Sequence, residues 1–103
     1  MFRHVVLMRW TAESTAAQQS AVRDALATLP GLIPQLRKYV VGADAGVSEG
    51  NFDLAVVADF DTFDDYVVYR DNADHQAMIR ELIRPILAER SAVQHQMPEE
   101  RES

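Results

Sequence analysis

A tyrosine and a histidine stand six residues apart, as Tyr69 and His75, and both side chains can take part in proton transfer. Histidine titrates near neutral pH, and a phenol can donate a hydrogen bond to negative charge that develops on oxygen. The only other histidines in the sequence are His4 and His95. Strand alternation or helical spacing would turn each histidine inward. The sequence therefore predicts a pocket whose candidate catalytic groups are His4, Tyr69 and His75.

The same residues also allow a purely structural interpretation. Tyr69 and His75 could hydrogen-bond to each other or to the backbone and so fix a break between two helical patterns. His4 faces the same way as Val6 and Met8 in a predicted strand, and a single buried histidine is usually a hydrogen-bonded core residue. The sequence leaves both interpretations open.

Metal binding is a third interpretation of the histidines. Three histidines with an open fourth position form a known zinc site, and His4 and His95 would be close if the first and last strands pair. The close His-x-His or His-x3-His spacing of strong zinc motifs is absent. The acidic segment that starts at Asp59 lacks the glycine and glutamate of a calcium loop, because Asp64 and Arg70 stand there. No metal and no cofactor are therefore expected.

The composition narrows the classes of partner. The 103 residues carry a formal net charge of −6 and no cysteine, which excludes a disulfide scaffold and a thiolate nucleophile. Nucleic-acid binding is not expected, because phosphate backbones are bound by clustered lysine and arginine. No apolar run is long enough for a signal peptide or a membrane span, so we expect a cytoplasmic protein without membrane contact.

Hydrophobic periodicity divides the chain into elements in the order β-α-β-β-α-β. Strands are predicted over residues 2–10, 35–42, 52–60 and 91–97. Helices are predicted over residues 15–29, which a capping box of Thr15 and Gln18 begins, and on both sides of the break at residues 71–74. Pro85 should loosen the last helix near its end.

This order predicts an α+β, ferredoxin-like fold: a four-stranded antiparallel sheet with both helices on one face. One domain over residues 1–97 and a charged, disordered tail over residues 98–103 account for the length. The first strand is apolar on both faces, which predicts a cover on both. The face away from the helices carries Val5, Leu7, Ala55 and Val57. A second copy of the chain is the simplest cover for that face, so a homodimer is expected.

Three short motifs together resemble one protein family. They are His4-Val5-Val6-Leu7, Phe52-Asp53-Leu54-Ala55 leading into Phe60, and Tyr69-x5-His75 before the helix with Pro85. On these residues the chain is similar to the stress-responsive α/β-barrel domain (Dabb) family from Phe2 to about Met97. The resemblance implies a homodimer in which two ferredoxin-like sheets pack into an α+β barrel. Many members of the family have no known activity.

A plant polyketide cyclase of this family performs an aldol-type cyclisation without a cofactor. The resemblance places its first-strand histidine, its helix-break tyrosine and its following histidine on His4, Tyr69 and His75. Its third-strand histidine, last-strand aspartate and His-Pro pair fall on Leu54, His95 and Asn72-Ala73. Since Leu54 cannot transfer a proton and His95 cannot replace a carboxylate, the resemblance implies the pocket, with cyclisation as one alternative.

The predicted pocket lies between the helices and the sheet and takes a small hydrophobic or aromatic ligand. Its predicted ligand-binding residues are Val6, Met8, Val22, Leu26, Leu54, Val56, Val93 and His95. Three alternatives stay open beside a pocket of unknown specific activity: a cyclase-like acid/base enzyme, a non-catalytic stress or accessory protein, and a cofactor-free monooxygenase.

Overall fold

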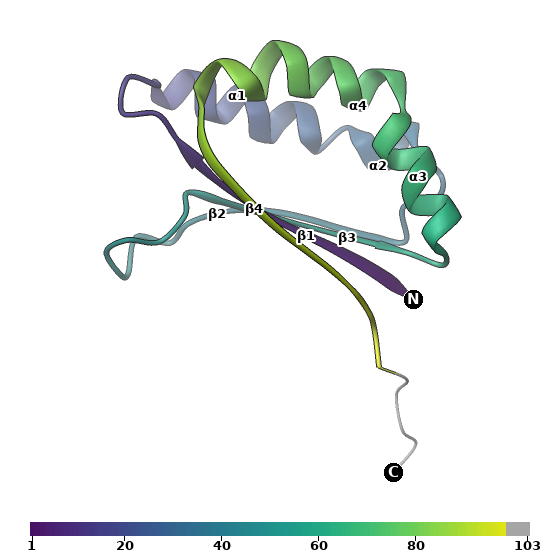
Figure 1. The fold of residues 1–103 in the computed structure, drawn as a ribbon. Helices are drawn as coiled ribbons and strands as arrows, with labels where there is room; N and C mark the ends of the chain where they lie inside the picture. The colour runs from purple at the N-terminus through teal and green to yellow at the C-terminus, as the bar shows by residue number, and fades with distance from the viewer. Residues whose placement is uncertain (99–103) are drawn as a thin grey trace.

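The computed structural model describes residues 1–98, so all but the first residue of the predicted tail lies outside the described residues. In chain order the elements are β1 (Phe2–Trp10), α1 (Ala16–Leu26), α2 (Leu29–Leu32), β2 (Lys38–Ala43), β3 (Leu54–Phe60), α3 (Phe63–Asp71), α4 (Ala73–Met78), a π-helical segment (Ile79–Ile83), a 3-10 turn (Arg84–Ile86) and β4 (Leu87–Gln96). Figure 1 shows the helices as one layer over the sheet.

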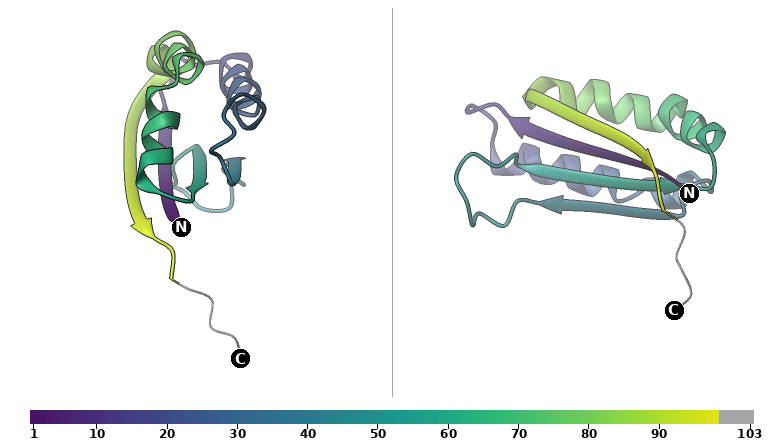
Figure 2. Two further views of the ribbon diagram at one scale, coloured as in Figure 1. Left: turned by 90° about the vertical axis from the view of Figure 1, so that its right-hand side faces the viewer. Right: turned by 60° about the horizontal axis from the view of Figure 1, so that its bottom comes forward.

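The sheet has the strand order β2-β3-β1-β4, and every neighbouring pair is antiparallel. The helices all lie on one face of the sheet, and the other face is open (Figure 2). This is the predicted ferredoxin-like α+β fold, with the apolar strand β3 in the interior of the sheet. None of the helices within residues 1–98 is long and apolar enough to cross a membrane.

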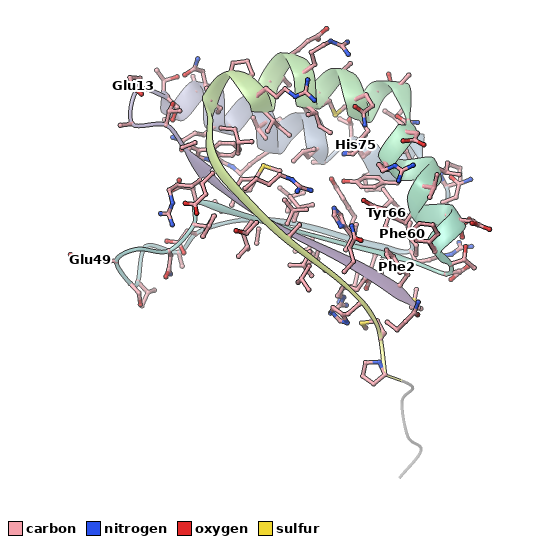
Figure 3. All side chains as sticks on the ribbon, in the orientation of Figure 1. Phe2, Glu13, Glu49, Phe60, Tyr66 and His75 are labelled. Atoms are coloured by element: carbon pink, nitrogen blue, oxygen red, sulfur yellow. The ribbon has the colours of Figure 1, made fainter. Side chains whose placement is uncertain are left out.

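The burial of β1 follows its alternating sequence. The residues that face the helices are buried, and they are Phe2, His4, Val6, Met8 and Trp10. Between them, the side chains that face the open side are only half-buried. Strand β3 repeats the pattern, because Leu54, Val56, Ala58 and Phe60 are all buried. The two central strands thus form the floor of the core (Figure 3).

Side-chain caps begin three of the helices. Thr15 and Gln18 form the predicted capping box at α1, in which each side chain bonds to the other residue's backbone N–H. The hydroxyl of Thr62 accepts from the Asp65 N–H at the start of α3. Asn72 separates α3 from α4, and its side-chain oxygen accepts from the His75 N–H at 3.0 Å. The cap at Asn72 therefore sets the position of a candidate catalytic residue.

Several predicted boundaries were wrong by a few residues. The first helix ends at Leu26, and Pro30 and Gly31 belong to the separate short helix α2. Pro30 fits there because a proline near a helix start has no N–H to leave unpaired. Strand β4 begins at Leu87 instead of residue 91, because it pairs with the whole length of β1 as far as Trp10, past a bulge at Arg9 and Trp10.

Pro85 loosens the last helix as predicted. The chain leaves the α-helical form after Met78, continues as the π-helical segment and tightens into the 3-10 turn that contains the proline. Proline lacks the N–H that would continue the helical ladder, so the last turns cannot remain regular. Short π-helical segments are frequent at functional sites.

Candidate functional site

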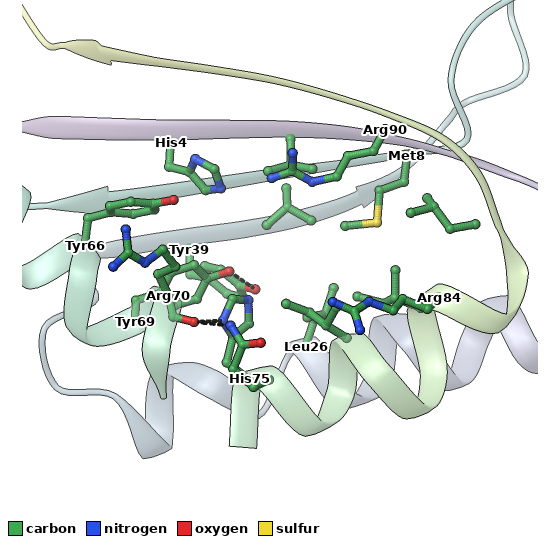
Figure 4. A pocket seen from close by; sticks show the side chains of 16 residues that line it. His4, Met8, Leu26, Tyr39, Tyr66, Tyr69, Arg70, His75, Arg84 and Arg90 are labelled. Atoms are coloured by element: carbon green, nitrogen blue, oxygen red, sulfur yellow. Dashed lines mark hydrogen bonds between the residues drawn. The ribbon is translucent and has the colours of Figure 1, made fainter. Parts of the chain in front are cut away.

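A cavity of about 320 Å³ lies between the helix layer and the sheet. Small-molecule sites span about 300–1,000 Å³, so this cavity has the size for a small ligand. It is lined by His4, Val6, Met8, Leu26, Tyr39, Val56, Tyr66, Tyr69, Arg70, His75, Gln76, Ile79, Ile83, Arg84, Leu87 and Arg90. Figure 4 shows the aromatic and histidine side chains at one end of the cavity and aliphatic ones along it.

The polar floor of that end is a single row of residues across all four strands. Tyr39 pairs with Ala58, Ala58 with His4, and His4 with Gln94. Residues paired in this way project from the same face of the sheet. Ala58 is the smallest member and is fully buried, so the large rings of α3 can pack above it.

Aromatic rings from α3 form the end wall. Tyr66 lies over His4 with ring centroids 4.9 Å apart, and Tyr69 stacks on His75 at 4.1 Å. Both tyrosines also contact Phe60, so the wall is continuous with the core (Figure 3). Close aromatic packing of this kind holds side chains in one rotamer. The candidate catalytic groups are therefore fixed before any ligand arrives.

His75 presents one of its two ring nitrogens to the cavity. Its Nδ1 lies 3.3 Å from the backbone carbonyl oxygen of Arg70, which can only accept a hydrogen bond. Nδ1 therefore carries the proton in the neutral ring, and Nε2 carries the free lone pair. Burial lowers the pKa of His75, and hydrogen bonds to the carbonyls of Arg70 and Tyr69 only partly oppose that effect. The ring is thus neutral near pH 7 and can accept a proton at Nε2.

His4 has the opposite arrangement. The side-chain amide of Gln94 donates to its Nδ1 at 3.0 Å and also donates to the Tyr66 hydroxyl at 3.1 Å. Because Nδ1 accepts, the proton of the neutral ring is on Nε2. Burial lowers the pKa of His4 to about 4, and the charges of Arg90 and His75 add to the effect. His4 is therefore a neutral hydrogen-bond donor near pH 7.

Tyr69 supplies a phenol that stays protonated. Its hydroxyl and that of Tyr39 are 3.3 Å apart, within hydrogen-bond distance. Burial raises the pKa of Tyr69 far above its ordinary value, and the neighbouring Tyr39 raises it further. Burial also raises the pKa of Tyr39, and the hydrogen bond to Tyr69 opposes that rise. The pair can donate or accept a hydrogen bond, and neither phenol is ionised near neutral pH.

The cavity lining contains three arginines and no carboxylate. Arg70 forms an ion pair with its neighbour Asp71 at 2.9 Å. Arg84 and Arg90 have no ion-pair partner among residues 1–98. Figure 4 shows Arg90 entering from the sheet side and Arg84 from the helix side. The site is therefore positively charged in a chain whose net charge is −6.

The structure brings together most of the residues that the sequence analysis assigned to the pocket. The three candidate catalytic residues and four of the predicted wall residues line the cavity, namely His4, Tyr69, His75, Val6, Met8, Leu26 and Val56. Val22 and Leu54 do not line it. They are 1% and 2% exposed and lie in the surrounding core.

The placement of Val93 and His95 in the pocket was wrong. Val93 pairs with Val5 and His95 with Arg3, so both project from the open face of the sheet. Val93 is 58% exposed there. The hydrophobic alternation of β4 indicated the correct strand but the wrong face, because the open face of this sheet is also apolar. The convergence of three histidines considered for zinc is likewise wrong, since His95 is on the far side of the sheet from His4.

The described residues, 1–98, contain no group of three or more histidine, aspartate, glutamate or cysteine side chains that could hold a metal ion. The acidic segment that starts at Asp59 has other roles. Asp59 forms an ion pair with Arg3 at 2.7 Å, and Asp61 forms one with Arg37. The hydrogen bond from Arg3 lowers the pKa of Asp59 despite its burial.

Sequence reasoning missed several residues of the site, in particular Tyr39, Tyr66, Arg84, Arg90 and Gln94. One signal was present for Tyr66, because it is three residues before Tyr69 and so shares its helix face. Tyr39 is on β2, and its hydroxyl contacts that of Tyr69, which only the three-dimensional structure shows. Gln94 and Arg90 can be placed in the site only from the register of β4 against β1, which no local sequence pattern specifies.

One comparison with known proteins identifies a family. A family model described as the stress responsive A/B barrel domain matches residues 2–96. A comparison with curated proteins gives no match.

Several solved structures have the same fold. A dimeric ferredoxin-like protein of unknown function from Thermobifida fusca is 45% identical, with a TM-score of 0.86 over 93% of this chain and 90% of that one. One from Bacteroides fragilis, also described as dimeric, is 23% identical, with a TM-score of 0.81 over 93% and 95%. A hydroxynitrile lyase from Passiflora edulis is 16% identical, with a TM-score of 0.82 over 98% and 96%, and shows the fold alone.

Proposed function

Because the chain belongs to the stress responsive A/B barrel domain family, we propose that it is a homodimer whose subunits each bind a small carbonyl compound and catalyse proton transfer on it. One observation carries the proposal. His75 and His4 line the same cavity in opposite neutral forms, one with a free lone pair on Nε2 and the other with a proton on Nε2. Such a pair is a base and a hydrogen-bond donor that work at the same pH.

The reaction that fits this pair is removal of a proton from carbon next to a carbonyl group. Nε2 of His75 takes the proton as the C–H bond breaks, and the electron pair moves onto the carbonyl oxygen as an enolate. Nε2–H of His4 donates a hydrogen bond to that oxygen, where the negative charge develops. The proton then returns from His75 to carbon. Alternatively, the enolate carbon attacks a second carbonyl in an aldol-type step, and the alkoxide that forms on that second carbonyl takes the proton from His75. No cofactor is needed for either outcome.

The walls indicate the shape of the substrate. Val6, Val56, Leu26, Ile79 and Ile83 form an apolar channel beside the histidines, and the tyrosine rings close its end. A flat apolar or aromatic group next to the carbonyl would fill this space, because such walls favour the burial of apolar surface. The plant cyclase of the family, whose substrate is a polyketide, is an analogy that supports the same class of compound.

The proposal predicts catalysed deuterium exchange in an aryl ketone. Phenylacetone in D2O should lose its methylene proton signal faster with the protein than without it, as followed by proton NMR. The His75→Ala variant should lower this rate by about a hundredfold, the size expected for a general base. The cap at Asn72 uses the backbone N–H and remains in the variant, whereas loss of the buried, stacked ring should lower the melting temperature. Exchange is therefore measured well below the melting temperature of both proteins.

The matched control is His95→Ala, since His95 is exposed on the opposite face of the sheet. That variant should exchange the ketone at the parent rate. Exchange no faster than in buffer, or equal rates for His75→Ala and His95→Ala, would contradict the catalytic proposal.

A second candidate function is non-catalytic binding, and one feature favours it. The Tyr69 hydroxyl is shared with Tyr39, and the His75 ring is held by the Arg70 carbonyl, so both groups also stabilise the helix break. Under this alternative the ketone binds, as seen by calorimetry or by NMR shifts, without faster exchange.

A further inference from the structure

We propose that the natural ligand of the cavity is a carboxylic acid, with its carboxylate held by Arg84 and Arg90 and its reactive carbonyl at the histidine end. This inference rests on the proposed function and names the class of its substrate. The first observation is the charge of the cavity lining. The sequence has 16 acidic and 10 basic residues, yet three arginines and no acid line the cavity.

The charges of the lining arginines are not equally available. Asp71 accepts hydrogen bonds from Nε and Nη2 of Arg70, at 2.9 and 3.1 Å, so that guanidinium already has a carboxylate partner. Arg84 and Arg90 are in no ion pair within residues 1–98, although five other arginines there are. A guanidinium group matches the geometry of a carboxylate, so these two arginines are suited to bind an anionic ligand.

The two arginines approach the cavity from opposite walls. Arg90 is on β4 and pairs with Met8, so it projects from the helix-facing side of the sheet. Arg84 is the first residue of the 3-10 turn, directly after the π-helical segment. Figure 4 shows both guanidinium groups directed into the cavity, Arg90 toward His4 and Arg84 toward Leu26. Each guanidinium offers a planar set of donors that suits a carboxylate.

The charge of Arg90 already acts on the catalytic end. After burial, it is the largest cause that lowers the pKa of His4, and it opposes the rise in the pKa of Tyr69. A bound carboxylate would neutralise part of this field, so an acid stabilises the loaded site in a way that a neutral ligand cannot.

Strand geometry separates the anion site from the reactive site. Arg90 pairs with Met8, which is four residues from His4 on one face of β1, or about 13 Å along the strand. The Arg90 side chain extends back toward His4, so its guanidinium is closer to the histidine end than its backbone is (Figure 4). The apolar row of Val6 and Val56 lies between His4 and Met8. A ligand that bridges the two ends therefore has an aromatic or other flat apolar body, with a carboxylate at one end and a carbonyl at the other.

Two matched probes test the inference. They are phenylacetone with a para-carboxylate and phenylacetone with a para-carboxamide, which share a shape and a reactive methylene and differ in charge. The carboxylate should bind at least about tenfold more tightly by calorimetry, as expected for charge-assisted hydrogen bonds. Its affinity should also fall as salt is raised from low to physiological concentration, and that of the carboxamide should not.

The variants are Arg84→Gln, Arg90→Gln and the control Arg80→Gln. Arg80 is four residues before Arg84, is paired with Glu81 at 3.7 Å and does not line the cavity. All three variants change the net charge equally. Each of the first two should weaken the carboxylate probe by about tenfold and leave the carboxamide unchanged, and the control should leave both unchanged. Because Arg84 and Arg90 are exposed, all three should melt with the parent protein.

The outcomes separate this inference from the proposed function. Equal affinity for the two probes, or equal effects of Arg80→Gln and Arg90→Gln, would overturn the carboxylate assignment while catalysed exchange still stands. Tight carboxylate binding that depends on Arg84 and Arg90 without any exchange would confirm the ligand class and overturn catalysis. Failure of both probes to bind would overturn both.

Discussion

His4 and His75 differ in which ring nitrogen carries the proton, and one neighbour decides each case. Gln94 donates to Nδ1 of His4, and the Arg70 carbonyl accepts from Nδ1 of His75. Burial lowers both pKa values, so neither ring needs to lose a proton before it can act near neutral pH. At the scale of single residues, the site therefore combines a hydrogen-bond donor, His4, with a proton acceptor, His75.

The role of Gln94 gives a direct prediction. In Gln94→Glu a carboxylate faces Nδ1 of His4, which favours the charged ring. The pKa of His4 should rise from about 4. A rise of about 1–3 pH units is expected from a neighbouring opposite charge. The measurement is an NMR titration of the histidine ring signals. In the parent protein His4 should stay neutral until the pH falls close to 4.

Gln96→Glu is the control for this change. Gln96 is on the same strand and face and pairs with Phe2, so it adds the same charge one pair further from His4. A midpoint for His4 that moves equally in both variants would show a general charge effect and contradict the assigned contact.

At the scale of elements, the break between α3 and α4 positions the catalytic end. Tyr66 and Tyr69 are on α3, and His75 is on α4. Asn72 caps α4 through the His75 N–H, and the Tyr69 and His75 rings stack across the break. The break therefore places two rings face to face, which an uninterrupted helix could not do for residues six apart, because they point in different directions.

The cap itself can be tested with a matched pair of variants. Asn72→Ala should lower the free energy of unfolding by about 1 kcal/mol, the usual effect of losing an N-cap side chain. Thr15→Ala removes the equivalent group from α1 and should lower stability by a similar amount. Only Asn72→Ala should also weaken phenylacetone binding, because only that cap holds His75. Thermal melting and calorimetry measure the two effects, and equal binding in both variants would contradict the role given to Asn72.

Element order and the faces of β1 and β3 could be predicted from the sequence because their periodicity is strong and local. The pairing of Tyr69 with His75 could also be predicted, since both flank one recognisable break. Which residues of β4 face the helices could not be predicted from the sequence. Both faces of this sheet carry apolar residues, so alternation alone does not say which of Ala92 and Val93 faces the helices. Arg84 was missed because the π-helical segment before it changes the direction that helical spacing would give.

At the scale of the whole molecule, the open face of the sheet is apolar and suited to pack against a partner. Val40, Val57, Val5 and Val93 form one continuous row across all four strands on that face. Val40 is 45% exposed and Val93 58%. A contiguous apolar strip of this kind is typical of an interface, and two solved structures with the same fold are described as dimeric. Packing of two such faces is the homodimer proposed above.

The dimer gives a prediction at this scale. Leu7→Asp puts a charge beside the valine row, and burying an unpaired charge in an interface is unfavourable by several kcal/mol. The variant should be a monomer by light scattering at micromolar concentration, where the parent protein is a dimer. Val47→Asp is the control, because Val47 is exposed in the loop between β2 and β3 and is not on the sheet. A monomeric parent protein would contradict the proposal.

Strand β4 has a consequence for how this pocket can change. It is an edge strand, and its helix-facing residues Arg90, Ala92 and Gln94 are exposed, although Gln94 still contacts Tyr66 of α3. Yet these positions hold the groups that set the proton on His4 and its electric field. Substitutions there alter the chemistry of the site while the buried core stays intact. For protein engineering, and equally for natural divergence, β4 is the place where new substrates can be accepted without loss of the fold.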